Sequence, residues 1–393
     1  MKNNNILILD EKKCTGCGMC SRICPKGAIS MKINSEGFLY PEIDNDKCIN
    51  CGLCLKKCQN FNNNYKKMIQ EPLKKFSGRN INLEDASKSS SGGIFGLMAR
   101  YVIENNGYVC GAVIDENLNV YHKLSNEIEV INKMLGSKYV QSNIIDCYSE
   151  VKEKLDGGNF VLFCGTPCQI YALKGYLNKE YENLICIDLI CHGVPSPIFF
   201  KKHISLNYGE NTEVLRFRNK DKFDSNSYSF LLKKGNKLKR IDAINDSYFS
   251  LFIDENSYRE SCYLCSFANK NRVGDITLGD STKKYDSFEY AAVLSLILVN
   301  TKKGLLFWEK VCNQIKYVEA DFEYELKKNK CLNLPCVRKD IRDSVYLDYF
   351  RMSTSEFNKK YKKHIGLKNK IKLVLRKSIS LKTKERIKKI LER

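Results

Sequence analysis

Eight cysteines near the amino terminus have the residue type and the spacing that bind iron–sulfur clusters. They form two runs of the pattern C-x2-C-x2-C-x3-C, the first followed by Pro25 and the second by Gln59. In bacterial proteins with two 4Fe–4S clusters, the fourth cysteine of each such run binds the other cluster. The sequence therefore predicts one cluster on Cys14, Cys17, Cys20 and Cys58, and a second on Cys24, Cys48, Cys51 and Cys54.

Cysteines at this spacing have two other common uses, disulfides and zinc. Zinc sites also use C-x2-C pairs, often together with histidines, but neither run has a histidine nearby. Disulfides need an oxidising compartment. Electron transfer is the function that these two runs favour.

Further cysteines lie in the second part of the chain. Cys168, Cys191, Cys262 and Cys265 occur at expected strand ends or in loops, and Cys164 is an alternative to Cys168. Ligands bind at such strand ends in open α/β sheets. Clusters, zinc sites and redox dithiols share C-x2-C pairs, and free buried cysteines are common. Spacing alone therefore leaves a third 4Fe–4S cluster as one of several interpretations.

The segment 89–93, Ser-Ser-Ser-Gly-Gly, precedes an expected helix. Free backbone N–H groups and the helix dipole favour a phosphate at such a place. A serine that caps the helix is the alternative. The chain has no Walker or Rossmann glycine pattern, which disfavours a nucleoside triphosphatase.

Two kinds of basic side chain have a functional and a structural interpretation. His192 follows Cys191 and suits proton transfer near a cofactor, or a structural role in a tight turn. Four arginines could bind a phosphate or an acidic substrate, and a solvated or structural role is the alternative for each. They are Arg216, Arg218, Arg259 and Arg272.

The elements that must position these residues alternate between strands and helices. A helix is expected from Ile94 to before Gly107, since its apolar residues recur at helical spacing, and another at 169–177. Strands are expected at 108–114, 159–163, 184–190, 213–218, 228–233, 275–278 and 294–300. This order predicts an α/β domain with a mixed sheet and a meander of shorter strands inserted in its middle.

The patterns divide the chain into four segments. An α+β ferredoxin-like cluster module occupies 1–62, a polar linker 63–75, the α/β domain 76–340 and a basic helical tail 341–393. The net charge is +20, of which residues 366–393 carry +9 with eleven Lys or Arg and two Asp or Glu. Basic and aromatic residues do not interleave there, which argues against nucleic acid.

Apolar residues of this tail recur at roughly helical intervals. A basic amphipathic helix suits an acidic partner or an anionic membrane surface, and a solvated lysine-rich helix is the alternative. The amino terminus lacks an apolar run of signal-peptide length, and Ala291–Val299 is too short to cross a bilayer. Together with the nineteen cysteines, this predicts a cytoplasmic protein, peripheral to the membrane if the tail binds there.

Across residues 10–315 the chain resembles the coenzyme F420 hydrogenase/dehydrogenase beta-subunit family, in its bacterial branch with a fused two-cluster ferredoxin domain. The resemblance rests on six motifs in order: Ser90–Gly93, Gly136–Ser142, Gly165–Gln169, Cys191–Pro197, Ser261–Cys265 and Asp275–Asp280.

The resemblance implies an iron–sulfur flavoprotein oxidoreductase that exchanges electrons between clusters and an organic hydride carrier, a deazaflavin or another substrate. It implies FAD contacts from Ser91, Gly92, Gly93, Gly165, Thr166 and Pro167, and a third cluster on Cys168, Cys191, Cys262 and Cys265. The partner is then a redox protein or a low-potential carrier. The alternative is a non-enzymatic electron-transfer subunit that docks on a separate enzyme.

One segment departs from the family pattern. After Gly279-Asp280 the chain continues Ser281-Thr282-Lys283-Lys284, where relatives have an aromatic or glycine-rich turn. This difference bears on the floor of the substrate pocket, so the substrate itself stays open.

Overall fold

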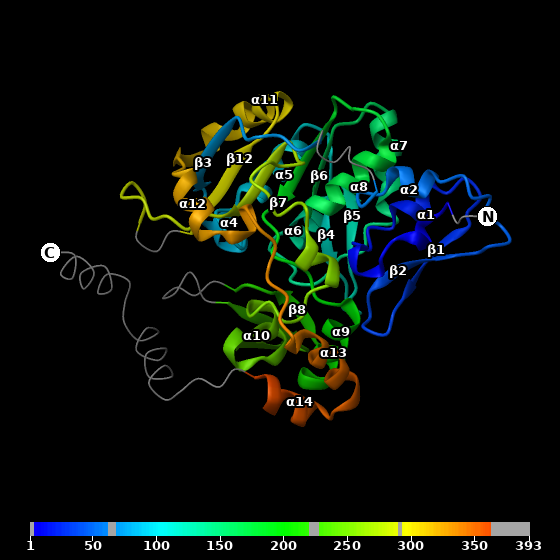
Figure 1. Ribbon diagram of the computed structural model, residues 1–393. Coiled ribbons are helices and arrows are strands. Elements are labelled where there is room, and N and C mark those ends of the chain that lie inside the picture. Colours follow the sequence, from blue (N-terminus) through cyan, green and yellow to red (C-terminus); the bar gives the residue numbers. More distant parts are fainter. Residues whose placement is uncertain (1–3, 62–67, 220–227, 290–292, 363–393) are drawn as a thin grey trace.

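The amino-terminal module contains a β-hairpin and two short helices. The computed structural model describes residues 4–61, 68–219, 228–289 and 293–362 (Figure 1). In it β1 (Ile29–Ile33) pairs antiparallel with β2 (Leu39–Ile43). The helices α1 (Met19–Ile23) and α2 (Leu53–Lys57) each start after a glycine with positive φ, Gly18 at 70° and Gly52 at 72°. Glycine adopts this conformation without strain, so the two cysteine runs share one turn geometry.

An eight-stranded mixed sheet forms the centre of the second domain, in the order β13–β3–β12–β11–β7–β6–β4–β5. The inner strands β11, β7, β6 and β4 are parallel to one another, and the outer pairings are antiparallel. Their bounds are β3 (Lys74–Asn80), β4 (Tyr108–Ile114), β5 (Val120–Ser125), β6 (Val161–Gly165), β7 (Leu184–Leu189), β11 (Ile276–Asp280), β12 (Ser295–Val299) and β13 (Ile315–Glu319).

Helices cover both faces of this sheet (Figure 1). On one face Leu162 and Ile185 pack with α5 (Ile94–Glu104), α6 (Ile128–Met134) and α11 (Lys302–Val311). On the other face Val161 and Phe163 pack with α7 (Cys147–Asp156) and α8 (Pro167–Leu177). Because successive side chains alternate between the faces of a strand, burial on both sides requires continuous apolar runs such as β6 and β7.

A smaller antiparallel sheet, in the order β10–β9–β8, lies below the main sheet in Figure 1. Its strands are β8 (Glu213–Arg216), β9 (Ser229–Lys234) and β10 (Lys237–Asp242). One aromatic core, which includes Phe199, Phe249, Tyr346 and Phe357, joins it to the neighbouring helices. These are α9 (Pro197–Tyr208), α10 (Ser247–Ile253), α13 (Ile341–Arg351) and α14 (Thr354–Tyr361). Two further short helices are α4 (Leu83–Lys88) and α12 (Phe322–Lys328).

The observed architecture confirms the predicted fold class. β4 has the predicted bounds, and α8 begins two residues before the predicted start because Thr166 and Gln169 form a capping box around Pro167. The inserted meander is the β8–β10 sheet. The β1–β2 hairpin, β3, β5, β13 and the third strand of the meander, β10, were not predicted. β3, β5 and β13 contain many polar or charged residues, which a hydrophobic pattern does not detect.

The carboxyl-terminal segment assigned to a basic tail begins inside the folded core. α13 and α14 bury Tyr346, Tyr349 and Phe357 there. The expected amphipathic helix at 366–393 lies outside the described residues. Within the described ranges, no helix has the length and apolar character needed to cross a membrane.

Candidate functional site

The first predicted cluster site is a cavity lined by all four of its predicted ligands. Cys14, Cys17, Cys20 and Cys58 surround it together with apolar side chains that include Ile6, Leu9, Met31 and Tyr171. Burial raises the pKa of the Cys20 thiol, and the neighbouring Cys17, Cys14 and Cys58 raise it further. Four thiols around one apolar cavity fit a cubane cluster, and binding of its iron ions would release the thiol protons.

The second predicted group lies on the outer side of the module. Cys54, Cys24 and Cys48 pack in one apolar cluster with Ile29 and Ile43. Burial raises the pKa of Cys54, and Cys51 adds to this. The Ala28 N–H donates to the Cys24 sulfur at 3.3 Å, the kind of contact that tunes a cluster thiolate. Cys51 itself is exposed, so this side of the module faces solvent.

The third group brings together cysteines from three separate segments. Cys168 lies in the first turn of α8, Cys191 follows β7, and Cys262 and Cys265 lie in and directly after a 3₁₀ turn, Glu260–Leu264. Burial raises the pKa of Cys191, and Cys262, Cys168 and Cys265 raise it further. Burial also raises the pKa of Cys168, and Cys265 and Cys262 raise it further. These mutual effects indicate that the four thiols are neighbours.

Cys164, the alternative to Cys168, has different neighbours. Burial raises its pKa to about 12, and the charged or titratable groups that act on it are Asp188, Lys138 and Cys186. Its carbonyl oxygen lies 2.9 Å from His122 Nε2. The local geometry therefore favours Cys168 over Cys164 as a member of the third group.

The segments expected to contact a flavin lie at the carboxyl edge of the parallel strands. Gly165 ends β6, and Thr166-Pro167 begins α8. The Gly92 N–H donates to Ser295 Oγ at 2.9 Å, and Ser295 is paired with Asp280 at the end of β11. Both helix N-termini thus lie at the edge where ligands bind in α/β sheets.

The two helix N-termini differ in how their N–H groups are used. The Thr166 N–H donates to Gln169 Oε1 at 3.0 Å, so α8 begins with a capped turn. α5 begins after Gly93, at a φ of 82°, and neither a side-chain cap nor an acidic residue occupies its first turn. A Cβ at Gly92 would lie 2.4 Å from the Gly78 carbonyl oxygen. Of the two places, the start of α5 better fits an anionic group.

The motifs behind the family resemblance meet in space. The Ser137 N–H donates to Ser90 Oγ at 2.8 Å, and Gln169 Nε2 donates to Ser142 Oγ at 3.0 Å. Gln141 and Arg259 donate their N–H groups to the carbonyl oxygens of Pro195 at 3.1 Å and Val194 at 2.9 Å. Motifs that are far apart in the sequence therefore contact one another in the folded chain.

The departure at Ser281–Lys284 has a structural use. Glu325 of α12 is fully buried and accepts hydrogen bonds from the Ser281 hydroxyl, at 2.8 Å, and from the Thr282 hydroxyl, at 2.7 Å. The N–H groups of Thr282 and Lys283 also donate to it. A buried carboxylate needs such donors. The segment therefore fixes α12 to the end of β11.

All four predicted arginines have protein partners. Arg218 pairs with Asp280 at 2.5 Å, and Arg272 donates to the Leu189 carbonyl oxygen at 2.9 Å. Arg216 donates to the Ser87 carbonyl oxygen, and Arg259 contacts the amino-terminal module. These contacts favour the structural interpretation that the sequence left open.

The sequence did not single out Cys331 and Cys336, which lie beside His192. Hydrogen bonds from Cys336 and then from His192 lower the pKa of Cys331. Their C-x4-C spacing is a weak signal. The contact with His192 spans 139 positions, so only the tertiary structure brings the three residues together.

A module with two cysteine groups, docked on an α/β domain that carries a third, defines an iron–sulfur protein of the electron-transfer class. Residues 13–61 match the 4Fe-4S dicluster domain, and residues 158–323 match the family described as the C terminus of the beta subunit of coenzyme F420 hydrogenase/dehydrogenase. Residues 158–323 are thus similar to this beta-subunit family, and the chain is related to F420-dependent enzymes.

Two relatives illustrate the similarity. The chain is 23% identical over 349 residues to the coenzyme F420-dependent sulfite reductase of Methanocaldococcus jannaschii, an alignment that covers 85% of this chain and 51% of that protein. It thus spans about half the length of this curated relative. A chain of the F420-reducing [NiFe] hydrogenase complex from Methanosarcina barkeri matches with a TM-score of 0.47 and 17% identity, over 67% of this chain and 90% of that chain.

Proposed function

We propose that this protein is an iron–sulfur flavoprotein oxidoreductase that moves electrons between 4Fe–4S clusters and an organic hydride carrier. Bound clusters would supply single-electron chemistry, and bound FAD would couple it to two-electron exchange with the organic molecule. Eight cysteines of the amino-terminal module hold the first two clusters. Cys168, Cys191, Cys262 and Cys265 hold the third.

The observation that carries the proposal is the proximity of the first and third cysteine groups. Cys17 of the first group is one of the residues that raise the pKa of Cys168 of the third. The Tyr148 hydroxyl, on α7, donates to the Cys17 carbonyl oxygen at 2.8 Å. Burial raises the pKa of this tyrosine, and Cys17 and Cys168 raise it further. Cofactors held by these two groups would be neighbours across the contact made by the buried Tyr148.

The start of α5 supports the flavin part of the proposal. Ser91, Gly92 and Gly93 hold the backbone there so that the first turn of α5 presents uncapped N–H groups. Such a turn suits the phosphates of FAD. Gly165, Thr166 and Pro167 are proposed to contact the same cofactor from the end of β6.

The hydride carrier is proposed from the relatives. The sulfite reductase relative is named for its dependence on coenzyme F420, a deazaflavin. A deazaflavin or another organic hydride carrier is therefore the substrate class that we propose for this chain. Ser281–Lys283, which is hydrogen-bonded to Glu325, is the segment that departs from the family pattern, and we propose that it shapes the substrate pocket.

A second function, electron delivery to a separate enzyme, is favoured by the outer surface of the module. Cys51 is exposed there, and the exposed fractions of Leu7, Ile8 and Ile49 are 50%, 50% and 59%. A cluster close to an exposed apolar surface suits electron exchange with a protein partner. The chain also corresponds to only half of its sulfite reductase relative.

Cofactor content and activity of the anaerobically purified protein test both functions. The oxidoreductase predicts about twelve iron atoms and one flavin per chain, and reduction of a low-potential dye by a hydride donor without any partner. About eight iron atoms per chain without flavin would contradict the oxidoreductase function and would support electron delivery to a separate enzyme.

Matched serine variants locate the clusters. Cys17→Ser should lose about four iron atoms, because one cubane loses a ligand. Cys312→Ser is the control, since Cys312 follows α11 and its thiol contacts only a backbone oxygen, that of Glu309, among the hydrogen bonds of the described residues. Equal iron content in both variants would exclude Cys17 as a ligand.

A further inference from the structure

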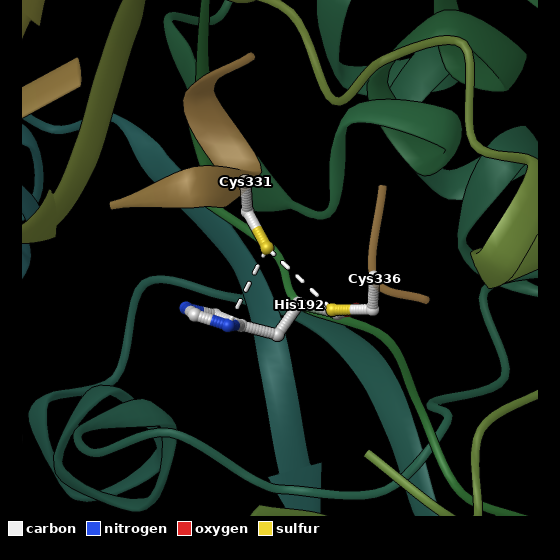
Figure 2. A group of neighbouring side chains, drawn as sticks. All are labelled: His192, Cys331 and Cys336. Atoms are coloured by element: carbon white, nitrogen blue, oxygen red, sulfur yellow. Dashed lines mark hydrogen bonds between the residues drawn. The ribbon is translucent and has the colours of Figure 1, made fainter. Parts of the chain in front are cut away.

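A separate group of metal-ligating side chains lies beside the third cysteine group. His192 follows Cys191, Cys331 lies in a 3₁₀ turn (Lys330–Leu332), and Cys336 precedes α13. Figure 2 shows the two sulfur atoms and the imidazole ring converging. One ligand atom from each residue lies within 4.8 Å of the other two. Nothing in the proposed electron-transfer function uses this group.

The two distances from the Cys331 sulfur to the other ligand atoms match those around a tetrahedral ion. Zn–S bonds of about 2.3 Å and Zn–N bonds of about 2.0 Å place two sulfurs about 3.8 Å apart and sulfur about 3.5 Å from nitrogen. The Cys331 and Cys336 sulfurs are 3.7 Å apart, and the Cys331 sulfur is 3.4 Å from His192 Nδ1. A disulfide would need about 2.05 Å.

Burial and charge are also those of a metal site. Cys331 and Cys336 are 3% and 7% exposed, whereas His192 is exposed. Two thiolates and a neutral imidazole balance the charge of a divalent cation, so the occupied site would bury no net charge. In the thiol form, Cys336 donates to the His192 carbonyl oxygen at 3.1 Å, a proton that metal binding would release.

We propose that His192, Cys331 and Cys336 bind one zinc-type divalent cation with a coordination position left open. Among the described residues the group contains three ligands, and three protein ligands with an open fourth position are the pattern of catalytic zinc sites. The exposed side of His192 gives water or a small anionic or carbonyl ligand access to that position. The same ion ties the segment between α12 and α13 to the end of β7.

The first experiment measures zinc in the full-length protein, purified anaerobically with its clusters. We expect about one zinc per chain, and His192→Gln, Cys331→Ser and Cys336→Ser should each weaken zinc affinity by at least about 100-fold. Cys312→Ser should keep the zinc. Iron and flavin are measured in the same samples, so loss of zinc alone separates this site from the proposed function.

Cobalt serves as a spectroscopic probe of the ligands. Co²⁺ added to zinc-depleted protein should give thiolate-to-cobalt charge-transfer bands and the visible bands of a tetrahedral ion. These bands should be absent in the Cys331→Ser/Cys336→Ser double variant. Wild-type protein that binds neither zinc nor cobalt at this site, or a double variant that keeps both, would overturn the proposal.

Cysteine alkylation of the wild-type protein tests the site without any substitution, so the test does not depend on whether the variants fold. Zinc should slow alkylation of Cys331 and Cys336 by at least about tenfold relative to chelator-treated protein, and should leave Cys312 unaffected. Peptide mass spectrometry reads each cysteine separately. A Cys331–Cys336 disulfide in anaerobically prepared protein, or alkylation that zinc does not change, would contradict the site.

Discussion

Arg259 Nε donates to the carbonyl oxygen of Cys14 at 2.7 Å, across 245 positions of the sequence. The same guanidinium donates to the Leu39 carbonyl oxygen at 2.7 Å and to Gln141 Oε1 at 3.1 Å, and it lies 4.1 Å from the centre of the Tyr40 ring. Arg259 is 1% exposed, and its carbonyl oxygen accepts from the Cys262 N–H at 2.9 Å. One buried residue therefore connects the first and third cysteine groups, through its side chain to Cys14 and through its backbone to Cys262.

Replacing Arg259 by methionine should destabilise this junction. The substitution keeps much of the volume but leaves two buried carbonyl oxygens without their charged donor, at a cost of about 3 kcal/mol. We expect a lower midpoint of urea unfolding and faster loss of iron to a chelator. Arg351→Met, at the exposed end of α13, is the matched control. Unfolding midpoints that agree between the two variants would show that Arg259 does not hold the junction.

Serine variants of Cys164 and Cys168, the two cysteines that flank Gly165–Pro167, should differ in the iron content of the protein. Cys168→Ser should lose about four iron atoms because a cubane then lacks a ligand, whereas Cys164→Ser should keep all of them. The reason is that Cys262 and Cys265 are close enough to Cys168 to influence its pKa, whereas the pKa of Cys164 is influenced by Lys138 and Asp188. Iron analysis with electron paramagnetic resonance of the reduced protein measures this. The opposite order would assign the ligand to Cys164.

An ion pair holds the amino-terminal hairpin to α13. Arg342 is 1% exposed, donates to both carboxylate oxygens of Glu36, and lies 3.0 Å from Glu260. Arg342→Met should lower the free energy of unfolding by about 3 kcal/mol, since it leaves the partly buried Glu36 carboxylate unpaired, whereas Glu260 keeps Arg338. Glu36→Gln should cost less, because Glu260 remains with the arginine.

A double-mutant cycle isolates this contact. Arg342→Met combined with Glu36→Gln should destabilise by less than the sum of the single changes. Additive effects in urea unfolding would mean that the two side chains do not stabilise each other.

His122 should make stability depend on pH in the mildly acidic range. Burial lowers the pKa of His122 to about 4, and its Nδ1 is buried without a hydrogen-bond partner among the described residues. An unfolded histidine takes up a proton near pH 6.5. The stabilisation is therefore complete above about pH 6.5 and is lost as pH falls towards about 4, by about 3 kcal/mol in all.

His122→Gln is the variant that tests this dependence. Glutamine can still donate to the Cys164 carbonyl oxygen but has no proton to gain. Between about pH 7.5 and about pH 5, the wild-type protein should lose more of its free energy of unfolding than the variant loses. Parallel pH profiles would show that His122 is not the responsible group.

The sequence by itself determined what depends on local spacing. The two cysteine runs predict their clusters because each run lies on one short stretch of chain that wraps a cofactor. Strands such as 108–114 and 184–190 were predictable because strands buried on both faces must be continuously apolar. The order of strands and helices then indicated the α/β class, and the structure confirms it.

Only the tertiary structure decided what depends on distant contacts. The neighbours of Cys168 and Cys164, the role of Arg259 and the meeting of His192 with Cys331 and Cys336 have no local sequence signal. Likewise α13 and α14 belong to the aromatic core although their sequence is rich in charge. The physical reason is that parallel strands bring their carboxyl ends to one edge, so residues more than a hundred positions apart become neighbours only when the sheet forms.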